Sequence, residues 1–312
     1  MLPKYPKIIP ELNLHSSNQT DMNHKSIKHK LLSKFFQKRI EKDGLIYFYY
    51  HKSKKEEFMP LFTLTKSLAL YNDYIDSKDP KYLEEFKKLS KVLIDEMEAD
   101  GRMNGWKHKK SLQLPGYPPI KRSYSALFNG RGLWMLIRYY DISKDKDIIS
   151  KIDQVLNTFL IQSDKWWVMK KEWNDTWYLE YSYWNNSPVV FNWLFSAFVW
   201  LYEVYLYWPE EVKQKAKDIF DKWIDTFKRN SEKSIYNWKF FDWFRYDDNK
   251  LYFADGDYGD IETKQMKCLF ELTWDKELEK IYKKYKNIYE KNKFKAWIYE
   301  WYYFLKKRFY MK

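Results

Sequence analysis

The sequence contains little of what zinc, disulfide and histidine chemistry requires. It has one cysteine, Cys268, and five histidines among 312 residues. One cysteine excludes a disulfide framework, and no Cys/His spacing of a zinc site is present. No two histidines are four residues apart, so we expect neither a zinc nor a histidine-based mechanism. The N-terminal residues also lack the apolar run of a signal peptide. We therefore expect a cytoplasmic location and leave membrane association open.

Aromatic content and charge indicate the kind of partner. Aromatic residues make up 21% of the chain, including 16 tryptophans and 28 tyrosines. Such rings suit a groove that holds sugars, although genome base composition explains them as readily. The formal net charge is +13, which attracts polyanions, while many lysine runs are simply solvated helix faces. Without a compact recognition motif, we expect no nucleic-acid partner.

Residues 188–208 form the longest apolar stretch. They contain a single charge, Glu203, in 21 residues, which satisfies the length rule for a membrane span. Asn192, Ser196 and Glu203 interrupt the stretch. We expect a fully buried helix of a repeat here, and no transmembrane segment.

A repeat of helical hairpins organises the chain. The second helix of each pair carries an apolar stripe at helical spacing, and polar connections precede it at Asp79, Asp145, Pro209 and Asp275. These positions are 66, 64 and 66 residues apart, and a regular period is typical of repeat architectures. The stripes are Leu83, Phe86, Leu89, Val92 and Leu93; Ile148, Ile149, Ile152, Val155, Leu156 and Phe159; Val212, Ala216, Ile219, Phe220, Trp223 and Phe227; and Leu278, Ile281, Tyr282, Tyr285 and Ile288.

The first helices of the pairs are predicted at residues 61–74, 123–140, 187–207 and 261–272. They are apolar nearly all round, which is typical of helices buried on every side, whereas the second helices are one-faced. We therefore predict an all-α fold, an α/α toroid built as an incomplete (α/α)6-type barrel. An open helical solenoid is the alternative. Residues 59–312 would form this domain, after an extension of residues 1–58 in which residues 45–50 are a candidate strand.

Three long loops separate the hairpins, at residues 99–122, 163–186 and 230–260. Each leaves the end of an outer helix, so we expect all three on one face, where sites are commonly built. They carry half of the tryptophans, namely Trp106, Trp166, Trp167, Trp173, Trp177, Trp184, Trp238 and Trp243.

The junctions between these loops and the first helices hold a set of motifs. They are Gly105-Trp106, Pro115-Gly116-Tyr117, residues 124–132, residues 177–181, residues 187–192 and Asp257-Tyr258. In this order and spacing the set resembles the C-terminal catalytic domain of D-glucuronyl C5-epimerases, over roughly residues 59–289. That family turns D-glucuronic acid into L-iduronic acid within heparosan-type polysaccharides.

The resemblance implies roles for particular residues. Glu180 and Tyr181 match the Glu-Tyr pair of the family's first catalytic motif, and Tyr258 matches its second catalytic tyrosine. Asn192 matches an asparagine that shortly follows the first catalytic motif in the family. Several positions depart from the pattern, so the resemblance indicates the reaction type better than the substrate. The departures are Ser182 for Pro, Trp193 for Gly, Asn129-Gly130-Arg131 for Gln-Gly-Gln, and Phe241 to Arg245 for Tyr-Asp-Leu-Arg.

Epimerisation at C5 needs two proton-transfer groups on opposite sides of the sugar and cations that neutralise its carboxylate. Tyr181 and Tyr258 come from the starts of different predicted inner helices, so a ring fold could place them across a cleft. Glu180 could act as a base or orient a tyrosine. The candidate cations are Arg131, Arg245, Lys121 and Arg122, and the candidate substrate contacts also include Trp106, Tyr124, Trp177 and Asn192.

Other interpretations remain open at this point. A polysaccharide lyase shares the abstraction of the C5 proton, and a glycoside hydrolase could pair Glu180 with Asp255, Asp257 or Asp260. A non-catalytic protein that binds an acidic glycan would use the charge and the tryptophans. In each case the expected partner is an anionic polysaccharide without an organic cofactor. A structural calcium ion and a homodimer are left open.

Overall fold

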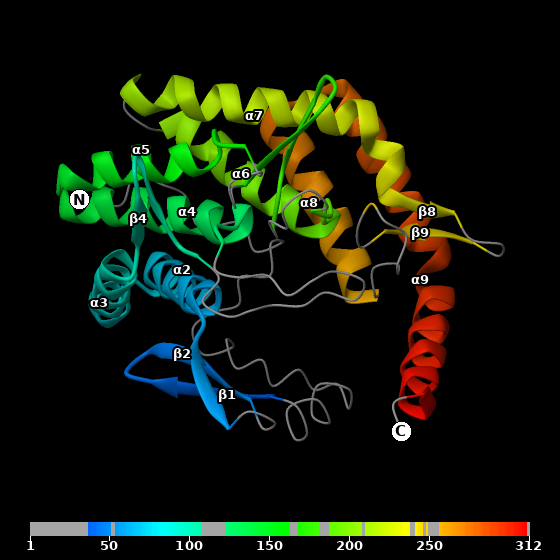
Figure 1. Ribbon diagram of the computed structural model, residues 1–312, viewed down its shortest axis with the longest axis horizontal. Helices are drawn as coiled ribbons and strands as arrows, with labels where there is room; N and C mark the ends of the chain where they lie inside the picture. The colour runs from blue at the N-terminus through cyan, green and yellow to red at the C-terminus, as the bar shows by residue number, and fades with distance from the viewer. Residues whose placement is uncertain are drawn as a thin grey trace.

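The computed structural model is predominantly helical (Figure 1). It describes residues 37–50, 54–107, 123–162, 168–180, 187–207, 210–237, 241–245, 248 and 256–310. In this part of the chain the eight α-helices form four consecutive pairs. The pairs are α2 (Pro60–Ser77) with α3 (Pro80–Asp95), α4 (Ala126–Ser143) with α5 (Asp147–Thr158), α6 (Phe191–Tyr207) with α7 (Glu210–Asn230), and α8 (Gly256–Thr273) with α9 (Lys276–Tyr310).

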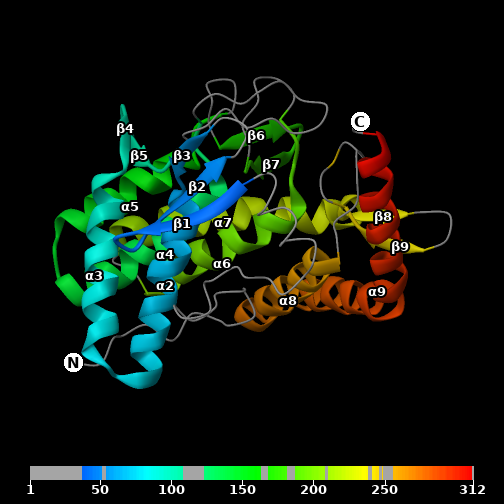
Figure 2. The same cartoon turned by 90° about the horizontal axis from the view of Figure 1, so that it is seen from below.

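The helical repeat predicted from the sequence is confirmed. The first residues of α2, α4, α6 and α8 are 66, 65 and 65 positions apart. Each of these helices packs against its partner, and successive ones also pack on each other, α2 on α4, α4 on α6 and α6 on α8 (Figures 1 and 2). They are the inner row and α3, α5, α7 and α9 the outer helices. The closure of the inner row into a toroid stays a prediction.

The burial of the outer helices follows their apolar stripes. In α5 the stripe residues Ile148, Ile152, Val155 and Leu156 are all buried, while the polar residues between them are more exposed. In α7 the whole predicted stripe is buried. One-faced helices of this kind draw their stability mainly from packing of the apolar face. The stripes therefore identify the faces that contact the inner row.

The turns between inner and outer helices repeat in atomic detail. Lys78, Lys144 and Trp274 each adopt a positive φ, of 58°, 57° and 54°, directly after an inner helix. In each turn a hydroxyl accepts a hydrogen bond from the N–H of the aspartate two residues later, and that aspartate accepts one from a backbone N–H of the next helix. The hydroxyls belong to Ser77, Ser143 and Thr273, and the aspartates are Asp79, Asp145 and Asp275. The recurrence shows that three of the repeats share one turn geometry.

The loops between the pairs contain short β-hairpins that the sequence did not reveal. They are β4 (Glu98–Asp100) with β5 (Met103–Gly105), β6 (Met169–Glu172) with β7 (Asp175–Tyr178), and β8 (Ile235–Asn237) with β9 (Asp242–Phe244), which follows the 3-10 helix η3 (Ser231–Ser234). Each pairing is antiparallel. The second strand of each hairpin contacts the next outer helix, β5 on α5, β7 on α7 and β9 on α9. The repeat unit is therefore a hairpin followed by two helices.

The predicted starts of α4 and α6 differ from the observed ones by three and four residues, and larger differences occur at α8 and before α2. α8 begins at Gly256, five residues before the predicted start, because its first turn is polar and shows no apolar stripe. Before α2, strands β1 (Gln37–Lys42), β2 (Leu45–Tyr50) and β3 (Lys55–Phe58) form an antiparallel sheet. β2 coincides with the strand predicted at residues 45–50. The domain boundary at residues 58 and 59 stays a prediction.

A buried ion pair joins the middle of the inner row. Arg138 of α4 donates from both terminal nitrogens to the carboxylate of Glu203 on α6, each at 2.9 Å. The Arg138 side chain is 0% exposed and that of Glu203 is 13% exposed. The ring of Tyr71, on α2, lies 5.3 Å from the guanidinium carbon. One cation thus connects three neighbouring inner helices.

No helix in the described part of the chain is both long and apolar enough to span a membrane. Residues 191–207 of the long apolar stretch form α6, whose contacts with α4, α7 and α8 surround it. This is the inner-helix position that the sequence favoured over a membrane span.

Removal of one partner from the Arg138–Glu203 pair should destabilise the fold strongly. Glu203→Gln leaves a buried cation without its counter-charge, and we expect a loss of about 3 kcal/mol in the free energy of unfolding. The double variant Arg138→Met, Glu203→Leu should recover much of this loss, because apolar side chains avoid the desolvation cost. Guanidinium titration of both variants, with the exposed Glu210→Gln as control, checks this. A loss as small as that of the control would contradict it.

The turn before α9 gives a second prediction. Asp275 accepts hydrogen bonds from the N–H groups of Glu277 and Leu278 and pairs with Lys228. Burial raises the pKa of Asp275, but Lys228 and these N–H groups outweigh it and hold the pKa below its usual value. Asp275→Ala should cost about 1 kcal/mol at neutral pH. Asp275→Asn keeps the cap and should cost less.

The pH dependence of this difference follows from the sign of the shift. A carboxylate whose pKa is lowered by folding contributes stability above its unfolded pKa and loses it as the pH falls through the folded value. The gap in unfolding free energy between the wild-type protein and Asp275→Ala should therefore narrow below about pH 4. Urea titrations at neutral and acid pH measure the gap, and one that does not narrow would exclude the ionised cap.

Candidate functional site

Two hydrogen bonds link the segments that precede three of the inner helices. The N–H of Ala126, the first residue of α4, donates to the carbonyl oxygen of Leu179 at 2.9 Å. The N–H of Val189, just before α6, donates to the carboxylate of Asp248 at 3.0 Å. The segments that lead into α4, α6 and α8 are thereby held together. We call this region the rim, meaning residues 123–131, 179–180, 187–192 and 256–260.

Glu180 is a buried carboxylate on the rim. It follows β7 and is 4% exposed. Its neighbour Leu179 is fixed on both sides, since its N–H donates to Val168 O at 2.6 Å and its carbonyl accepts from α4. Negative charge near the first turn of a helix is stabilised by the helix dipole. Because Leu179 is bonded to the first residue of α4, the backbone of Glu180 lies near such a helix start.

Arg131 lies close enough to Glu180 for their charges to interact. Burial lowers the pKa of the Arg131 guanidinium to about 10, and the charge of Glu180 opposes this effect. One terminal nitrogen of Arg131 donates to the hydroxyl of Thr65 on α2. The guanidinium carbon is 5.9 Å from the ring of Trp200 on α6. Because its pKa stays well above 7, Arg131 remains cationic at neutral pH.

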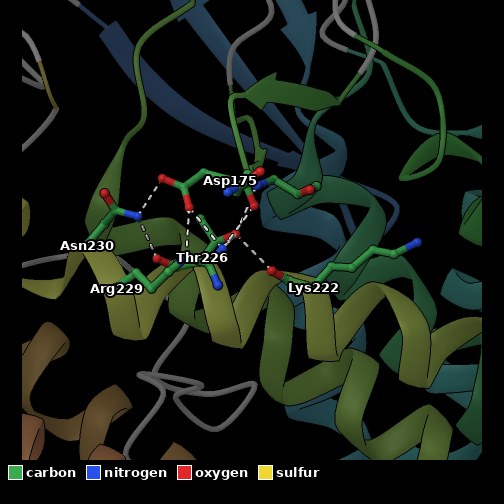
Figure 3. Close-up of polar contacts among 7 residues, drawn as sticks. Asp175, Lys222, Thr226, Arg229 and Asn230 are labelled. Atoms are coloured by element: carbon green, nitrogen blue, oxygen red, sulfur yellow. Dashed lines mark hydrogen bonds and ion pairs between the residues drawn. The ribbon is translucent and has the colours of Figure 1, made fainter.

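A polar clamp fastens the hairpin that leads into Glu180. Asp175, at the start of β7, receives hydrogen bonds from Arg229 and Asn230 at the end of α7 (Figure 3). Arg229 donates to one carboxylate oxygen at 2.9 Å and 3.1 Å, and Asn230 donates to the other at 2.7 Å. We call Asp175, Arg229, Asn230 and Thr226 the Asp175 clamp.

Thr226 completes the Asp175 clamp through the backbone. Its hydroxyl accepts from the N–H of Thr176 at 2.9 Å and donates to the carbonyl of Lys222, also at 2.9 Å (Figure 3). Asp175 and Glu180 are five residues apart, and β7 connects them directly. The clamp on α7 therefore sets where the backbone of Glu180 enters the rim.

Three aromatic residues expected to contact substrate are buried in the core. Trp106, Tyr124 and Trp177 are 1%, 1% and 2% exposed. The indole N–H of Trp106 donates to Leu93 O at 2.8 Å, and the hydroxyl of Tyr124 donates to Glu98 O at 2.8 Å. This burial favours a packing role for all three. Sequence alone could not separate the two roles, because loop tryptophans look the same in either case.

The glycine at position 132 reflects the packing of Trp106. A Cβ atom placed on Gly132 would lie 1.8 Å from the Trp106 ring. Asn129 holds the same tryptophan by its backbone, accepting from Trp106 N at 3.0 Å and donating to Trp106 O at 3.2 Å. The residues 129–132 that carry Arg131 are thereby packed against the β4–β5 hairpin.

The remaining predicted site residues are placed to different degrees. Asn192 is the second residue of α6 and Tyr258 the third of α8, so the backbones of both lie on the rim, while their side chains are outside the description. Tyr181 lies outside the described residues, as do Lys121, Arg122 and Asp255. Arg245 follows β9 and donates to Lys233 O at 3.3 Å, on the β8–β9 side.

Sequence reasoning missed a buried acid on α8. Glu262 is fully buried, and neither carboxylate oxygen has a hydrogen-bond partner among the described residues. Burial raises the pKa of Glu262 well above its ordinary value, which favours the protonated form. Its charge also raises the pKa of Tyr285 on α9, although burial of Tyr285 has the larger effect. The sequence feature that could have identified Glu262 is its position one helical turn after Tyr258.

Asp248 is a second acid that the sequence did not single out. Burial raises the pKa of its carboxyl, although the Val189 N–H and the nearby Lys170 oppose this shift. The Nζ atom of Lys170 lies 4.0 Å from the Oδ2 atom of Asp248 and 2.6 Å from the Oε1 atom of Glu172. Among the described residues, no group of three or more histidine, cysteine, aspartate or glutamate side chains is arranged to hold a metal ion.

Loss of the Asp175 clamp should weaken the fold and loosen the hairpin. Asp175→Ala removes the acceptor of three charged or polar donors, and we expect a cost of about 2 kcal/mol in unfolding free energy. Asp225→Ala, on the exposed face of α7, should stay within about 0.5 kcal/mol of the wild-type protein. Hydrogen exchange should rise first at residues 169–178. Unchanged exchange there would contradict the clamp.

The comparison with known families concerns the part of the chain that forms the rim. Residues 121–287 match the family described as D-glucuronyl C5-epimerase C-terminus. A search of curated proteins finds no match. The matched region runs from 121 to 287 inclusive, which is 167 of the 312 residues, and it contains Arg131, Glu180 and Tyr258. The chain therefore belongs to the D-glucuronyl C5-epimerase family.

Proposed function

We propose that this protein is a uronyl C5-epimerase that acts on an anionic polysaccharide and converts D-glucuronic to L-iduronic acid units. The observation that carries the proposal is the buried Glu180 within electrostatic range of the cationic Arg131, on a rim that lies within the family match. A carboxylate next to a cation suits chemistry in which a proton leaves a carbon α to another carboxylate.

The reaction breaks the C5–H bond of the uronic acid unit. A base on one side of the ring takes the proton, and the electron pair moves into the sugar carboxylate. An acid on the other side then donates a proton to C5, and the electron pair returns to form the new C–H bond. After one turnover the base carries one more proton and the acid one fewer, and proton exchange with the solvent restores both groups. No oxidant or reductant is needed.

Residues of this chain would divide these tasks between helix starts. Glu180 lies on the rim before α6, Tyr181 is the next residue in the sequence, and the backbone of Tyr258 lies in the first turn of α8. These positions would supply the two proton-transfer groups. Arg131 would neutralise the sugar carboxylate as charge gathers on it, and such electrostatic stabilisation is usually the largest contribution to the rate. Asn192 would hydrogen-bond the substrate.

The electrostatics of Arg131 support this assignment. A partly buried guanidinium beside an aromatic ring interacts more strongly with an anion than one in water does. Thr65 and Trp200 hold the Arg131 side chain from two neighbouring helices, which limits its reorganisation when substrate binds. A pre-oriented cation of this kind stabilises developing charge at low cost.

Deuterium incorporation tests the reaction. With heparosan-like polymer in deuterated water, the wild-type protein should introduce deuterium at C5. Glu180→Gln should reduce the rate by 100-fold or more, the range expected for loss of a proton-transfer group. Glu172→Gln provides a matched control, because Glu172 lies on the same hairpin and is 43% exposed. It should exchange at the wild-type rate.

The companion variants separate the roles and the competing reactions. Arg131→Lys keeps the charge but loses the fork, and should lower kcat by more than it raises KM. Tyr181→Phe and Tyr258→Phe should each abolish proton transfer on one side of the sugar ring. Ultraviolet absorbance of an unsaturated sugar would assign a lyase, and new reducing ends without it would assign a hydrolase. Absence of C5 exchange with all heparosan-like polymers would exclude this substrate class.

A further inference from the structure

The C-terminal part of α9 has two apolar faces, whereas an ordinary surface helix has one. Tyr285, Ile288 and Ala296 are buried at 0%, 5% and 0% exposure. On the same side, Tyr289 contacts Trp243 and Tyr299 contacts Phe241, with ring centroids 6.1 Å and 5.5 Å apart. This face packs on the β8–β9 hairpin and on α8, so it belongs to the core.

The second apolar face points to solvent. It consists of Phe294, Trp297, Ile298 and Tyr302, which are 68%, 53%, 47% and 55% exposed. Their spacing of three, four and eight residues places them on one side of the helix, opposite Ala296. We call these four residues the α9 outer face. In both views the red end of α9 that carries them lies at the edge of the molecule (Figures 1 and 2).

Exposed large hydrophobic side chains are concentrated in α9. The described chain has eight exposed large hydrophobic residues, and four of them form the α9 outer face within nine positions. The others are separated from it along the chain, at Leu160, Trp173, Leu206 and Trp274. Contiguous exposed apolar groups usually mark a binding surface, whereas scattered ones need no explanation.

Positive charge surrounds the α9 outer face. Lys293 and Lys295 are exposed and flank Phe294 in the sequence, so the helix places them on opposite margins of the face. Lys291 is exposed one turn earlier. Residues 291–308 contain six basic residues and one acidic residue. An apolar helix face with lysines along its margins is the arrangement that binds at the interface of an anionic lipid bilayer.

We propose that the α9 outer face docks on an anionic lipid surface, with its aromatic and aliphatic side chains in the acyl boundary and its lysines at the headgroups. The lysine stems can extend along the apolar face while their ammonium groups reach the phosphates. Helix α9 would then lie in the plane of the membrane and hold the domain beside it. This inference does not depend on the proposed reaction.

The charges and ring geometry favour a bilayer over two other occupants. A second copy of the chain would bring lysine margins against lysine margins, which repel. A glycan would need open ring faces, but Phe294 and Trp297 stack on each other with centroids 6.1 Å and planes 24° apart. Ile298, between them and Tyr302, also offers no stacking surface for a sugar. Lipid chains can cover all four side chains.

Vesicle co-sedimentation of the full chain tests the proposal. The protein should pellet with phosphatidylcholine vesicles that contain phosphatidylserine, and weakly or not at all with pure phosphatidylcholine. Trp297→Ser with Ile298→Ser should weaken binding to the anionic vesicles by at least tenfold. Lys293→Gln with Lys295→Gln should weaken binding on the order of tenfold, because each lysine near an anionic surface adds favourable free energy of binding.

Trp274→Asn is the matched control. Trp274 is 78% exposed but lies before α9, and its positive φ suits asparagine. This variant should bind vesicles as the wild-type protein does, and all variants should retain the wild-type melting temperature because the changed residues are exposed. C5 exchange on free polymer should be unaffected, which separates this surface from the rim.

Three results would overturn the proposal. The first is equal pelleting of the wild-type protein and the Trp297→Ser, Ile298→Ser variant. The second is a wild-type dimer in sedimentation velocity that this variant dissociates, with no lipid binding, which would assign the face to a second copy. The third is loss of heparosan binding in the variant with no change on vesicles, which would assign it to the glycan.

Discussion

The ion pair between Arg138 and Glu203 is the interaction on which the arrangement of the inner helices depends. Helices that are apolar nearly all round can present more than one face to a neighbour, so hydrophobicity alone does not fix their rotation. A bidentate bond between buried charges removes that freedom, since only one rotation of α4 against α6 satisfies both partners. Tyr71 on α2 contacts the same guanidinium and extends the constraint to a third helix.

The same constraint reaches the rim. Arg131 precedes Arg138 by seven residues, which is two turns of α4, so both lie along one stripe. That stripe meets α6 at successive levels. Arg138 contacts Glu203, Trp134 contacts Trp200 with ring centroids 5.1 Å apart, and Arg131 lies over Trp200. A rotation of α4 would therefore move Arg131 away from Glu180 as well as break the ion pair.

Local patterns in the sequence predicted the helices and their order, because a stripe such as Ile148 to Leu156 records which side of one helix is buried. The strands of the three hairpins between the helix pairs were not predictable in the same way. Pairs such as β4 and β5 are three residues long, too short to show alternation. Likewise, the polar first turn of α8 gave no periodic signal. The antiparallel hairpins form because the next outer helix provides contacts, and those contacts join residues far apart in the chain.

In the candidate site, too, sequence motifs indicated single residues, whereas the contacts between them depend on tertiary structure. Sequence motifs indicated Glu180, Arg131 and Tyr258 one at a time, but the proximity of Glu180 to Arg131 arises from the hydrogen bond between Ala126 and Leu179. Burial of Trp106 depends on Gly132 and Asn129, which pack against it from another element. The importance of Asp175 was invisible because its partners, Arg229 and Asn230, follow it by more than fifty residues.

The contact of each hairpin with the following outer helix gives the chain a direction of assembly. The hairpin that carries Asp175 is synthesised before α7, and the groups that hold it are the last residues of that helix. A nascent chain that ends within α7 therefore has the β6–β7 hairpin but lacks Arg229 and Asn230, which hold Asp175. The β8–β9 hairpin likewise packs against α9, which is synthesised after it. The backbone that leads into Glu180 can therefore be fastened to α7 only after the whole of that helix has been synthesised.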